Sequence, residues 1–383
     1  MAAEQSASGI WDIFCRVVDN FGDAGVCWRL ARILRHEHDL PVRLWIDDPQ
    51  TLRALYPALD PGSPRQSCEG ITVCRWPQAG LPDADAAVVI EAFGCGLPDD
   101  WIARMAQAAR PPLWIVLEYL SAEDWVDSHH GLSSPHPQLS LQRYFFFPGF
   151  TSATGGLPRE AGLLSRRDGF GTAARRVFWN RLGFDLPQVP AVSLFAYADA
   201  PFAGLLSAMV ADGRPLVLAV PEGAPLAAVR GWLGAGAAAE PGPWRRCSLE
   251  VRALPFLPQA QYDELLWACD LNFVRGEDSF VRAQWAGRPL VWQPYRQDDG
   301  AHQRKMAAFL ERYCADLPAP AATALQAFWR DWNAAGGGAV PSWPALRDAE
   351  PDLARHALNW SAKLADSDEL AAQLVEFARR KVK

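Results

Sequence analysis

Short apolar runs alternate with segments of helical periodicity, and this alternation occurs twice along the chain. In the first half the apolar runs cover residues 11–18, 42–46, 71–76, 86–90 and 113–117. After the first run, Val26, Leu30, Ile33 and Leu34 recur at helical spacing. Apolar strands joined by helices predict a parallel sheet that is covered on both faces. We therefore expect a doubly wound α/β sheet in this half.

The second half repeats the pattern. Its apolar runs predict strands over 192–197, 216–220, 249–254, 271–274 and 290–293. Helical spacing predicts one more helix at the end of the first half, over 175–182. In the second half it predicts helices over 262–269, 280–286, 302–312, 319–334 and 369–383, with a flexible break at 336–338. We expect two Rossmann-like domains, residues 9–186 and 187–383. The last helix either stays with the second domain or packs back on the first.

The composition excludes several classes of protein. Half of the 383 residues are apolar, 21% are charged, and the formal net charge is -7. This balance argues against nonspecific binding of nucleic acid or of anionic membranes. We find neither a signal peptide at the start nor the ~20 uninterrupted apolar residues of a membrane helix. The eight cysteines are scattered without a C-x-x-C pair, which favours reduced thiols in a cytoplasmic protein.

Three histidines lie close together in a segment with many loop residues. They are His129, His130 and His136, and Asp124 and Asp127 lie near them. Their spacing matches no recognised set of metal ligands. We expect a surface loop here and no metal site.

A first candidate site follows the first strand, in the turn Asp19-Asn20-Phe21-Gly22-Asp23-Ala24-Gly25. Ligands of open α/β sheets bind at the carboxyl ends of the strands. Gly22 and Gly25 are expected to let the backbone turn tightly there. The carboxylates of Asp19 and Asp23 then suit a cation or a general base. The structural alternative is that Asp23 only caps the following helix.

A second candidate site lies between a strand and a helix in the second half, in Arg275-Gly276-Glu277-Asp278-Ser279. Amide groups at a helix start can hold a diphosphate, and Arg275 adds positive charge. Glu277 and Asp278 would repel phosphate, so they are expected to meet sugar hydroxyls or to brace the loop. The alternative is an ordinary acidic helix start. Neither turn carries the glycine fingerprint of dinucleotide-binding proteins or a P-loop.

The second turn is followed by a helix of small residues, Gly287-Arg288-Pro289, a strand and Gln293-Pro294-Tyr295. This order resembles the donor half of GT-B glycosyltransferases. Together with WDIFCRVVDNFGD at residues 11–23, the resemblance narrows to the protein-arginine rhamnosyltransferases that act on elongation factor P. It covers essentially the whole chain after a short polar start.

The resemblance implies a GT-B fold, in which two facing Rossmann-like domains enclose a central cleft. It implies an acceptor side on the first domain and a donor site on the second. The implied donor is dTDP-β-L-rhamnose, and the implied acceptor is an arginine of elongation factor P. It also implies inversion at the anomeric carbon and no metal or other cofactor.

The family's site residues carry over to both turns. The base falls on Asp23, its neighbouring carboxylate on Asp19, and a second essential acid on Glu277. Donor contacts carry over to Asn20, Phe21, Gly22, Phe195, Tyr197, Phe256, Gln259, Arg275, Gly276, Asp278 and Ser279. For the residues outside the two turns, the alternative role is core packing.

Arginine is a difficult nucleophile, because its guanidinium is charged and its lone pairs are delocalised. A pair of carboxylates fits the task, since one can orient the guanidinium while the other accepts the proton. We assign Asp23 as the base and Asp19 as the orienting group, and the reverse assignment stays open.

Other functions remain compatible with these residues. A GT-B glycosyltransferase or a sugar-nucleotide epimerase acting on a small molecule is the main alternative. A noncatalytic protein that docks elongation factor P is a third. A nicotinamide dehydrogenase is disfavoured because its glycine fingerprint is missing.

Overall fold

The computed structural model describes residues 9–78, 80, 82, 84–234, 242–297, 299–334 and 338–381. The chain forms two compact units. The first comprises residues 1–161 and 365–383, and the second comprises 162–364. The expected boundary at 186/187 differs from this division, because residues 162–186 pack within the second unit. The expected break at 336–338 lies mostly outside the described residues.

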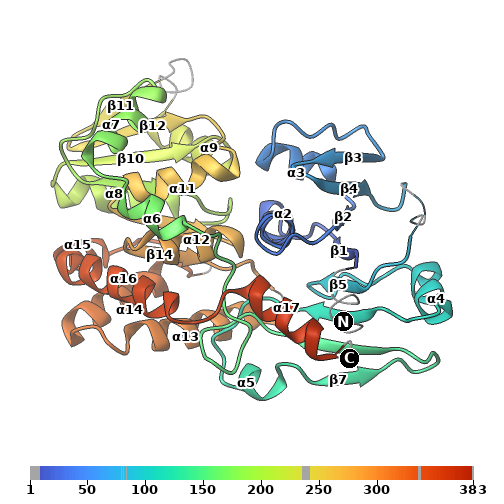
Figure 1. The fold of residues 1–383 in the computed structure, drawn as a ribbon. Coiled ribbons are helices and arrows are strands. Elements are labelled where there is room, and N and C mark those ends of the chain that lie inside the picture. Colours follow the sequence, from blue (N-terminus) through green and yellow to red (C-terminus); the bar gives the residue numbers. More distant parts are fainter. Residues whose placement is uncertain are drawn as a thin grey trace. The chain divides into compact units, whose positions relative to one another are not determined.

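The first unit is built on an eight-stranded sheet of order β3-β4-β2-β1-β5-β6-β8-β7 (Figure 1). The six inner strands pair in parallel, and β3 and β7 pair antiparallel at the two edges. Strands β1, β2, β5 and β6 are buried along their whole length, as their apolar sequences predict. The strands are β1 Trp11–Cys15, β2 Val42–Ile46, β3 Arg65–Cys68, β4 Ile71–Arg75, β5 Val88–Ala92, β6 Leu113–Leu117, β7 Ser133–Pro135 and β8 Gln142–Phe146. The helices are α2 Phe21–Glu37, α3 Pro49–Leu55, α4 Asp99–Gln107, α5 Trp125–His129 and α17 Leu370–Lys381.

The second unit is built on a six-stranded sheet of order β11-β12-β10-β9-β13-β14. Its strands pair in parallel except for β11, which is antiparallel at one edge. The strands are β9 Ala191–Leu194, β10 Leu216–Pro221, β11 Trp244–Arg246, β12 Leu249–Leu254, β13 Leu271–Arg275 and β14 Leu290–Gln293. The helices are α6 Leu163–Asp168, α7 Thr172–Arg181, α8 Phe202–Asp212, α9 Ala224–Leu233, α11 Gln259–Ala268, α12 Asp278–Ala286, α13 Ala301–Cys314, α14 Ala319–Trp332, α15 Trp343–Asp348 and α16 Glu350–Ala365.

Helix α7 shows why the second unit begins before residue 187. Phe178 and Trp179 are buried in one core cluster with Val217, Leu254 and Leu265 of the second sheet. The exposed fraction of the Trp179 side chain is 0%. The apolar side chains of α7 therefore pack on the second sheet, so this helix belongs to the second unit and not to the expected first domain.

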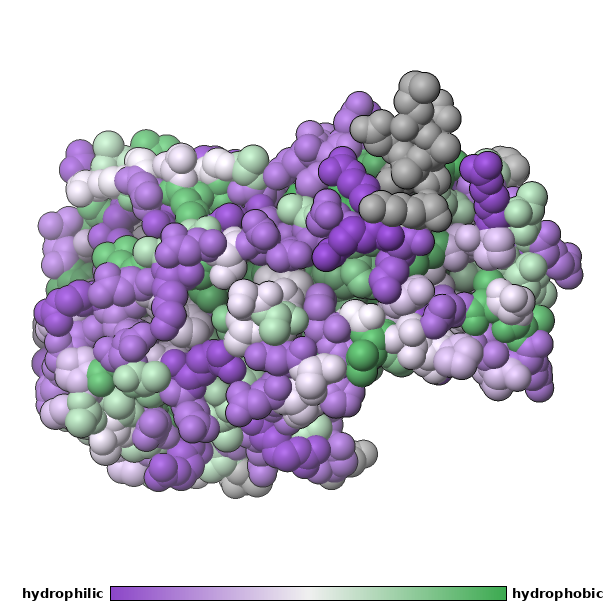
Figure 2. Space-filling view, turned by 60° about the horizontal axis from the view of Figure 1, so that its bottom comes forward, coloured by the Kyte–Doolittle hydropathy of each residue, from purple (hydrophilic) through white to green (hydrophobic). Residues whose placement is uncertain are grey.

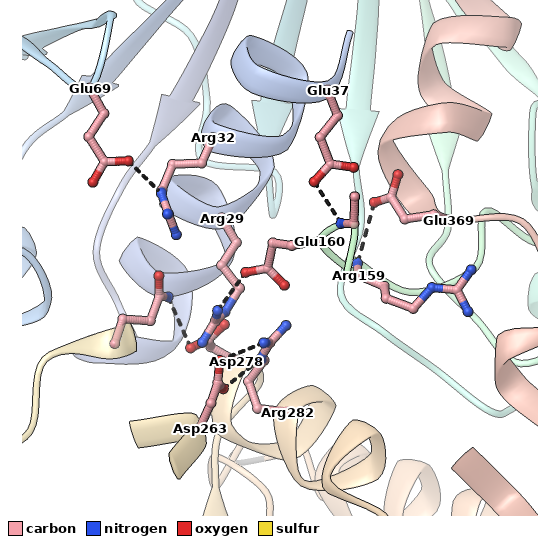
Figure 3. Close-up of polar contacts among 12 residues, drawn as sticks. Arg29, Arg32, Glu37, Glu69, Arg159, Glu160, Asp263, Asp278, Arg282 and Glu369 are labelled. Carbon is pink, nitrogen blue, oxygen red and sulfur yellow. Dashed lines mark hydrogen bonds and ion pairs between the residues drawn. The ribbon is translucent and has the colours of Figure 1, made fainter. Parts of the chain in front are cut away.

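The last helix belongs to the first unit. Phe377 of α17 makes edge-to-face contacts with Tyr144 and Phe146 of β8, and α17 also contacts α2. At the start of α17, the carboxylate of Glu369 accepts hydrogen bonds from the backbone N–H groups of Ala371 and Ala372 at 2.9 Å. Figure 3 shows Glu369 and Glu37 beside the segment that carries Arg159.

Glu369 should make the docking of α17 depend on pH. Burial raises its pKa to about 7, against 4.5 for an exposed glutamate. The carboxyl therefore stabilises the folded state below pH 4.5, and this contribution is lost as the pH rises through about 7. Since one pKa unit corresponds to about 1.4 kcal/mol, the rise from 4.5 to about 7 corresponds to a loss on the order of 3–4 kcal/mol. Glutamine at this position stays neutral at every pH. In hydrogen–deuterium exchange at pH 8, the α17 amides of Glu369→Gln should therefore be better protected than those of the unmodified chain. At pH 5.5 this difference should be smaller.

The exposed Glu376 of the same helix supplies the control. It lies 3.7 Å from Arg380 as a surface ion pair, which contributes little to stability. Glu376→Gln should leave the protection of α17 unchanged at both pH values. Equal protection of Glu369→Gln and the unmodified chain at both pH values would contradict the prediction.

The surface is mixed in character. The face drawn in Figure 2 is largely hydrophilic, with hydrophobic residues in small groups. Large apolar side chains that are exposed are spread over both units and include Val18, Trp125, Leu132, Val177, Tyr295 and Leu358. No helix in the described part of the chain has the length and apolar composition to cross a bilayer. The eight cysteines are all free thiols.

Candidate functional site

The loop between β1 and α2 is fixed by two carboxylates that bind its backbone. Asp47, at the end of β2, accepts a hydrogen bond from the N–H of Val17 at 2.9 Å. Oδ2 of Asp23 accepts from the N–H groups of both Val18 and Asp19 at 2.8 Å. Three consecutive backbone donors therefore point at acidic side chains, and the loop has little freedom to rearrange.

Asn20 makes the turn that we expected the glycines to make. It has φ 39° and ψ -111° and precedes the first residue of α2. Gly22 and Gly25 both lie inside α2, and neither has a positive φ. That expectation is wrong, because asparagine tolerates the left-handed region through its short polar side chain. Asp23 is also inside the helix, so it braces the preceding loop and does not occupy the cap position.

The electrostatic setting of Asp23 is unusual for an aspartate. Its side chain has an exposed fraction of 0%. Burial raises its pKa, while hydrogen bonds from Asp19, Val18 and the hydroxyl of Tyr119 act in the opposite direction. Asp19, whose N–H donates to Asp23, precedes α2 and is 6% exposed. The structure thus places Asp19 in the loop and Asp23 in the first turn of α2, where Phe21 and Gly22 also lie.

Two aromatic residues beside this loop were not among the predicted site residues. The hydroxyl of Tyr119 donates to Oδ1 of Asp23 at 3.1 Å. The ring of Tyr119 stacks on Phe93, with centroids 4.4 Å apart and planes at 13°. Both residues follow neighbouring parallel strands, β6 and β5, at their carboxyl ends. The rule that directed us to strand ends would also have indicated them.

In the second unit, Arg275 lies against two aromatic rings at the carboxyl end of the sheet. Its guanidinium carbon is 4.7 Å from the ring centroid of Phe195 and 4.5 Å from that of Tyr197. Phe195 and Tyr197 follow β9, and Arg275 ends β13, the neighbouring strand. Cation–π contacts of this kind fix the direction of a guanidinium while its charge is retained.

The loop after β13 is closed by its own hydrogen bonds. Gly276 has φ 58° and donates its N–H to the carbonyl oxygen of Gln293 at 3.1 Å. The hydroxyl of Ser279 donates to the carbonyl of Arg275 and accepts from its N–H group. Glu277 is half-buried at the cap position of α12 and makes no side-chain capping bond. The helix start is therefore acidic, with Glu277 at the cap position and Asp278 in the first turn, but Glu277 does not cap it with its side chain.

The start of α11 is tied to this loop. Gln259 donates to Oδ2 of Asp278 at 3.1 Å, and both side chains are buried. Arg282 and Asp263 form a buried two-bond ion pair between α12 and α11 (Figure 3). Phe256 lies half-buried in the segment between β12 and α11. The predicted donor-binding residues of the second half thus gather around the carboxyl ends of β9, β12 and β13.

The three histidines make local hydrogen bonds. Nδ1 of His129 contacts the carbonyl oxygen of Trp125, and Nδ1 of His130 accepts from the N–H of Phe147. Nδ1 of His136 accepts from two backbone N–H groups. Within the described ranges, no group of three or more His, Cys, Asp or Glu side chains is placed to hold a metal ion.

Two mostly parallel sheets flanked by helices, each with polar loops at the carboxyl ends of its strands, are the two Rossmann-like domains of the GT-B fold, which glycosyltransferases share. UGT2 of Phytolacca americana is similar in fold, with a TM-score of 0.51 at 13% identity over 97% of this chain and 99% of that chain. The sequence profile described as Elongation-Factor P (EF-P) rhamnosyltransferase EarP matches residues 11–379. The chain therefore belongs to the EarP family of EF-P rhamnosyltransferases.

Individual relatives agree with this assignment. A protein-arginine rhamnosyltransferase of Pseudomonas putida is 48% identical over 372 residues, covering 96% of this chain and 98% of the relative. One of Neisseria meningitidis is 34% identical over 385 residues, covering 96% of each. A solved structure that describes EarP-mediated arginine glycosylation of translation elongation factor EF-P is also similar. It matches at 36% identity and a TM-score of 0.69, covering 97% of this chain and 99% of that chain.

Proposed function

We propose that this protein transfers rhamnose from dTDP-β-L-rhamnose to a guanidine nitrogen of one arginine in EF-P, with inversion at the anomeric carbon. The observation that carries the proposal is membership of the EarP family over residues 11–379, which includes both candidate loops. The acceptor is a translation factor, so we place the reaction in the cytoplasm.

The second unit supplies the donor site in this proposal. Phe195 and Phe256 line the pocket of the nucleotide base, and Tyr197 and Gln259 contact the donor. Arg275 and the N–H groups at the start of α12 neutralise the diphosphate as it leaves, so the reaction needs no metal ion. Glu277 and Asp278 contact the sugar or hold the loop. The contacts of Arg275 with Phe195 and Tyr197 support this role. They hold the guanidinium in one orientation even when no negatively charged substrate is bound.

The first unit supplies the acceptor chemistry. Asp19 holds the acceptor guanidinium, and Asp23 takes the proton as the new bond forms. Asn20, Phe21 and Gly22 border these acids and contact the donor. The raised pKa of Asp23 supports its assignment as the base, since a carboxylate in a buried site is more basic than an exposed one.

Incubation with dTDP-rhamnose and folded EF-P tests the function directly. Fragmentation spectra should place one deoxyhexose on one arginine, and carbon–proton coupling at the anomeric carbon should report inversion. The yield should be the same with and without a chelator. A short peptide should be a much poorer acceptor than the folded domain, because docking would cost it ordering entropy.

Each alternative has its own outcome in this experiment. Sugar on serine or asparagine, or a retained configuration, would refute the arginine mechanism. Turnover of the donor to an epimer without EF-P would favour a sugar-nucleotide epimerase. Transfer to a small molecule and not to EF-P would favour another GT-B glycosyltransferase.

A further inference from the structure

The hydrogen bonds of Asp23 distinguish its two carboxylate oxygens. Oδ2 accepts two backbone N–H groups, from Val18 and Asp19, and these occupy the two acceptor positions of a carboxylate oxygen. Oδ1 accepts the hydroxyl of Tyr119 at 3.1 Å, which occupies one of its two positions. Oδ1 is therefore the oxygen that still has capacity to accept a proton.

Tyr119 is itself held by its surroundings. Its ring stacks on Phe93 at 4.4 Å, and the N–H of Phe93 donates to the carbonyl oxygen of Leu117 at 2.6 Å. Phe93 has φ 58°, in the left-handed region that a phenylalanine rarely adopts. Strain of this kind persists where the surrounding structure over-determines the backbone, and it occurs preferentially at functional sites.

We propose that Tyr119 is a positioning residue that fixes the carboxylate of Asp23 for proton transfer at Oδ1, and that Phe93 holds Tyr119 in place. This inference rests on the proposed function. It adds a second strand end to the acceptor chemistry, because Tyr119 follows β6 while both acids follow β1.

The reaction step is balanced without a co-reactant. The acceptor nitrogen forms a bond to the anomeric carbon as the bond from that carbon to the diphosphate oxygen breaks. The electron pair of the broken bond leaves with dTDP. The proton of the acceptor nitrogen goes to Oδ1 of Asp23, and Tyr119 keeps its own proton and orients the carboxylate throughout.

The titratable groups around Asp23 give the sign of a pH test. The thiols of Cys15 on β1 and Cys27 on α2 are near Asp23. The pKa of Cys15 is raised by its hydrogen bond with Cys27 and by burial, and the pKa of Cys27 is raised by burial. They stay neutral, whereas the carboxylate of Asp47 raises the pKa of Asp23. The Tyr119 hydroxyl lowers that pKa, so its removal should raise it.

Tyr119→Phe removes the hydroxyl and keeps the ring. We expect kcat for rhamnosyl transfer to fall about 10- to 100-fold, with a smaller change in KM for EF-P. The acidic limb of the pH profile should move to higher pH, because Asp23 must be deprotonated to act. Titration of the Asp23 carboxyl by carbon-13 NMR should show the same direction of shift without any acceptor present. Calorimetric binding of the donor should not change.

Tyr144→Phe is the matched control, because it removes a hydroxyl that bonds to Gln142 on β8 of the same unit. It should leave kcat, the pH profile and the Asp23 titration unchanged. Phe93→Leu keeps the Tyr119 hydroxyl but removes the stacked ring, so its effect should be smaller and of the same sign. This second variant also decides the matter if Tyr119→Phe fails to fold.

An unchanged acidic limb and Asp23 titration in folded Tyr119→Phe, or in Phe93→Leu if the first does not fold, would overturn the inference. If the unmodified protein did not modify EF-P, the proposed function would fail instead. The two failures are distinguishable, because the NMR titration needs neither donor nor acceptor.

Discussion

Replacing Asp23 with asparagine should lower rhamnosyl transfer to EF-P about 10³-fold while the protein stays folded and binds donor normally. An amide oxygen can still accept the N–H groups of Val18 and Asp19, and the amide nitrogen can donate to the hydroxyl oxygen of Tyr119. The loop therefore keeps its hydrogen bonds, whereas the ability to accept the proton is lost. General bases typically contribute 10²- to 10⁴-fold, which sets the expected size.

Single-turnover kinetics with folded EF-P and calorimetry of donor binding measure the two effects separately. Asp47→Asn is the matched control, because Asp47 bonds Val17 in the same loop as Asp23 bonds Val18. It should retain transfer within about threefold, because Asp47 braces the loop and acts on Asp23 only through its charge, as the smallest of the influences on its pKa. Near-normal turnover of folded Asp23→Asn would remove the base assignment and leave Asp23 a bracing residue.

Replacing Arg275 with glutamine should reduce kcat/KM for the donor about 10²-fold or more. The guanidinium is held against Phe195 and Tyr197, and the proposal places it against the charge that develops on the leaving diphosphate. Loss of one group that stabilises such charge typically costs 10²- to 10³-fold in rate. Arg275→Lys should recover part of the rate, since it keeps the charge but not the planar stacking.

Arg246→Gln provides the comparison in the same unit. Arg246 is exposed, and its guanidinium carbon lies 4.2 Å from the ring centroid of Trp232. Removing this arginine–aromatic pair should leave donor affinity and transfer within about twofold, as is usual for a surface substitution. If Arg275→Gln had the same donor affinity and turnover as Arg246→Gln, a role of Arg275 in binding the donor would be excluded.

Much of this architecture follows from apolar periodicity. Strands such as Val42–Ile46, Leu113–Leu117 and Leu249–Leu254 lie where the apolar runs predict them. The edge strands β3, β7 and β11 were not predicted, because their residues are polar or exposed and antiparallel pairing to a neighbour defines them. Periodicity detects burial, so it fails where a strand is only half covered.

The site was predictable as far as the strand ends could be located. Both turns lie at the carboxyl ends of their sheets, which is where the rule for open α/β sheets places ligands. The contact between Tyr119 and Asp23 could not be predicted in this way, because it depends on the order of β1, β5 and β6 in the sheet. The positive φ of Asn20 was not predicted, because Gly22 and Gly25 were the more obvious candidates for the turn, whereas both are helical.

The division of the chain has a consequence for biosynthesis. The first unit needs both its sheet, which begins with β1, and the distant helix α17, since Phe377 contacts Phe146 of β8 and α17 contacts α2. The second unit is complete in sequence before α17 has been synthesised. Domains usually fold in the order in which the ribosome makes them. Here the later half of the chain can finish folding first, and the unit that carries Asp19 and Asp23 must wait until α17 has emerged from the ribosome.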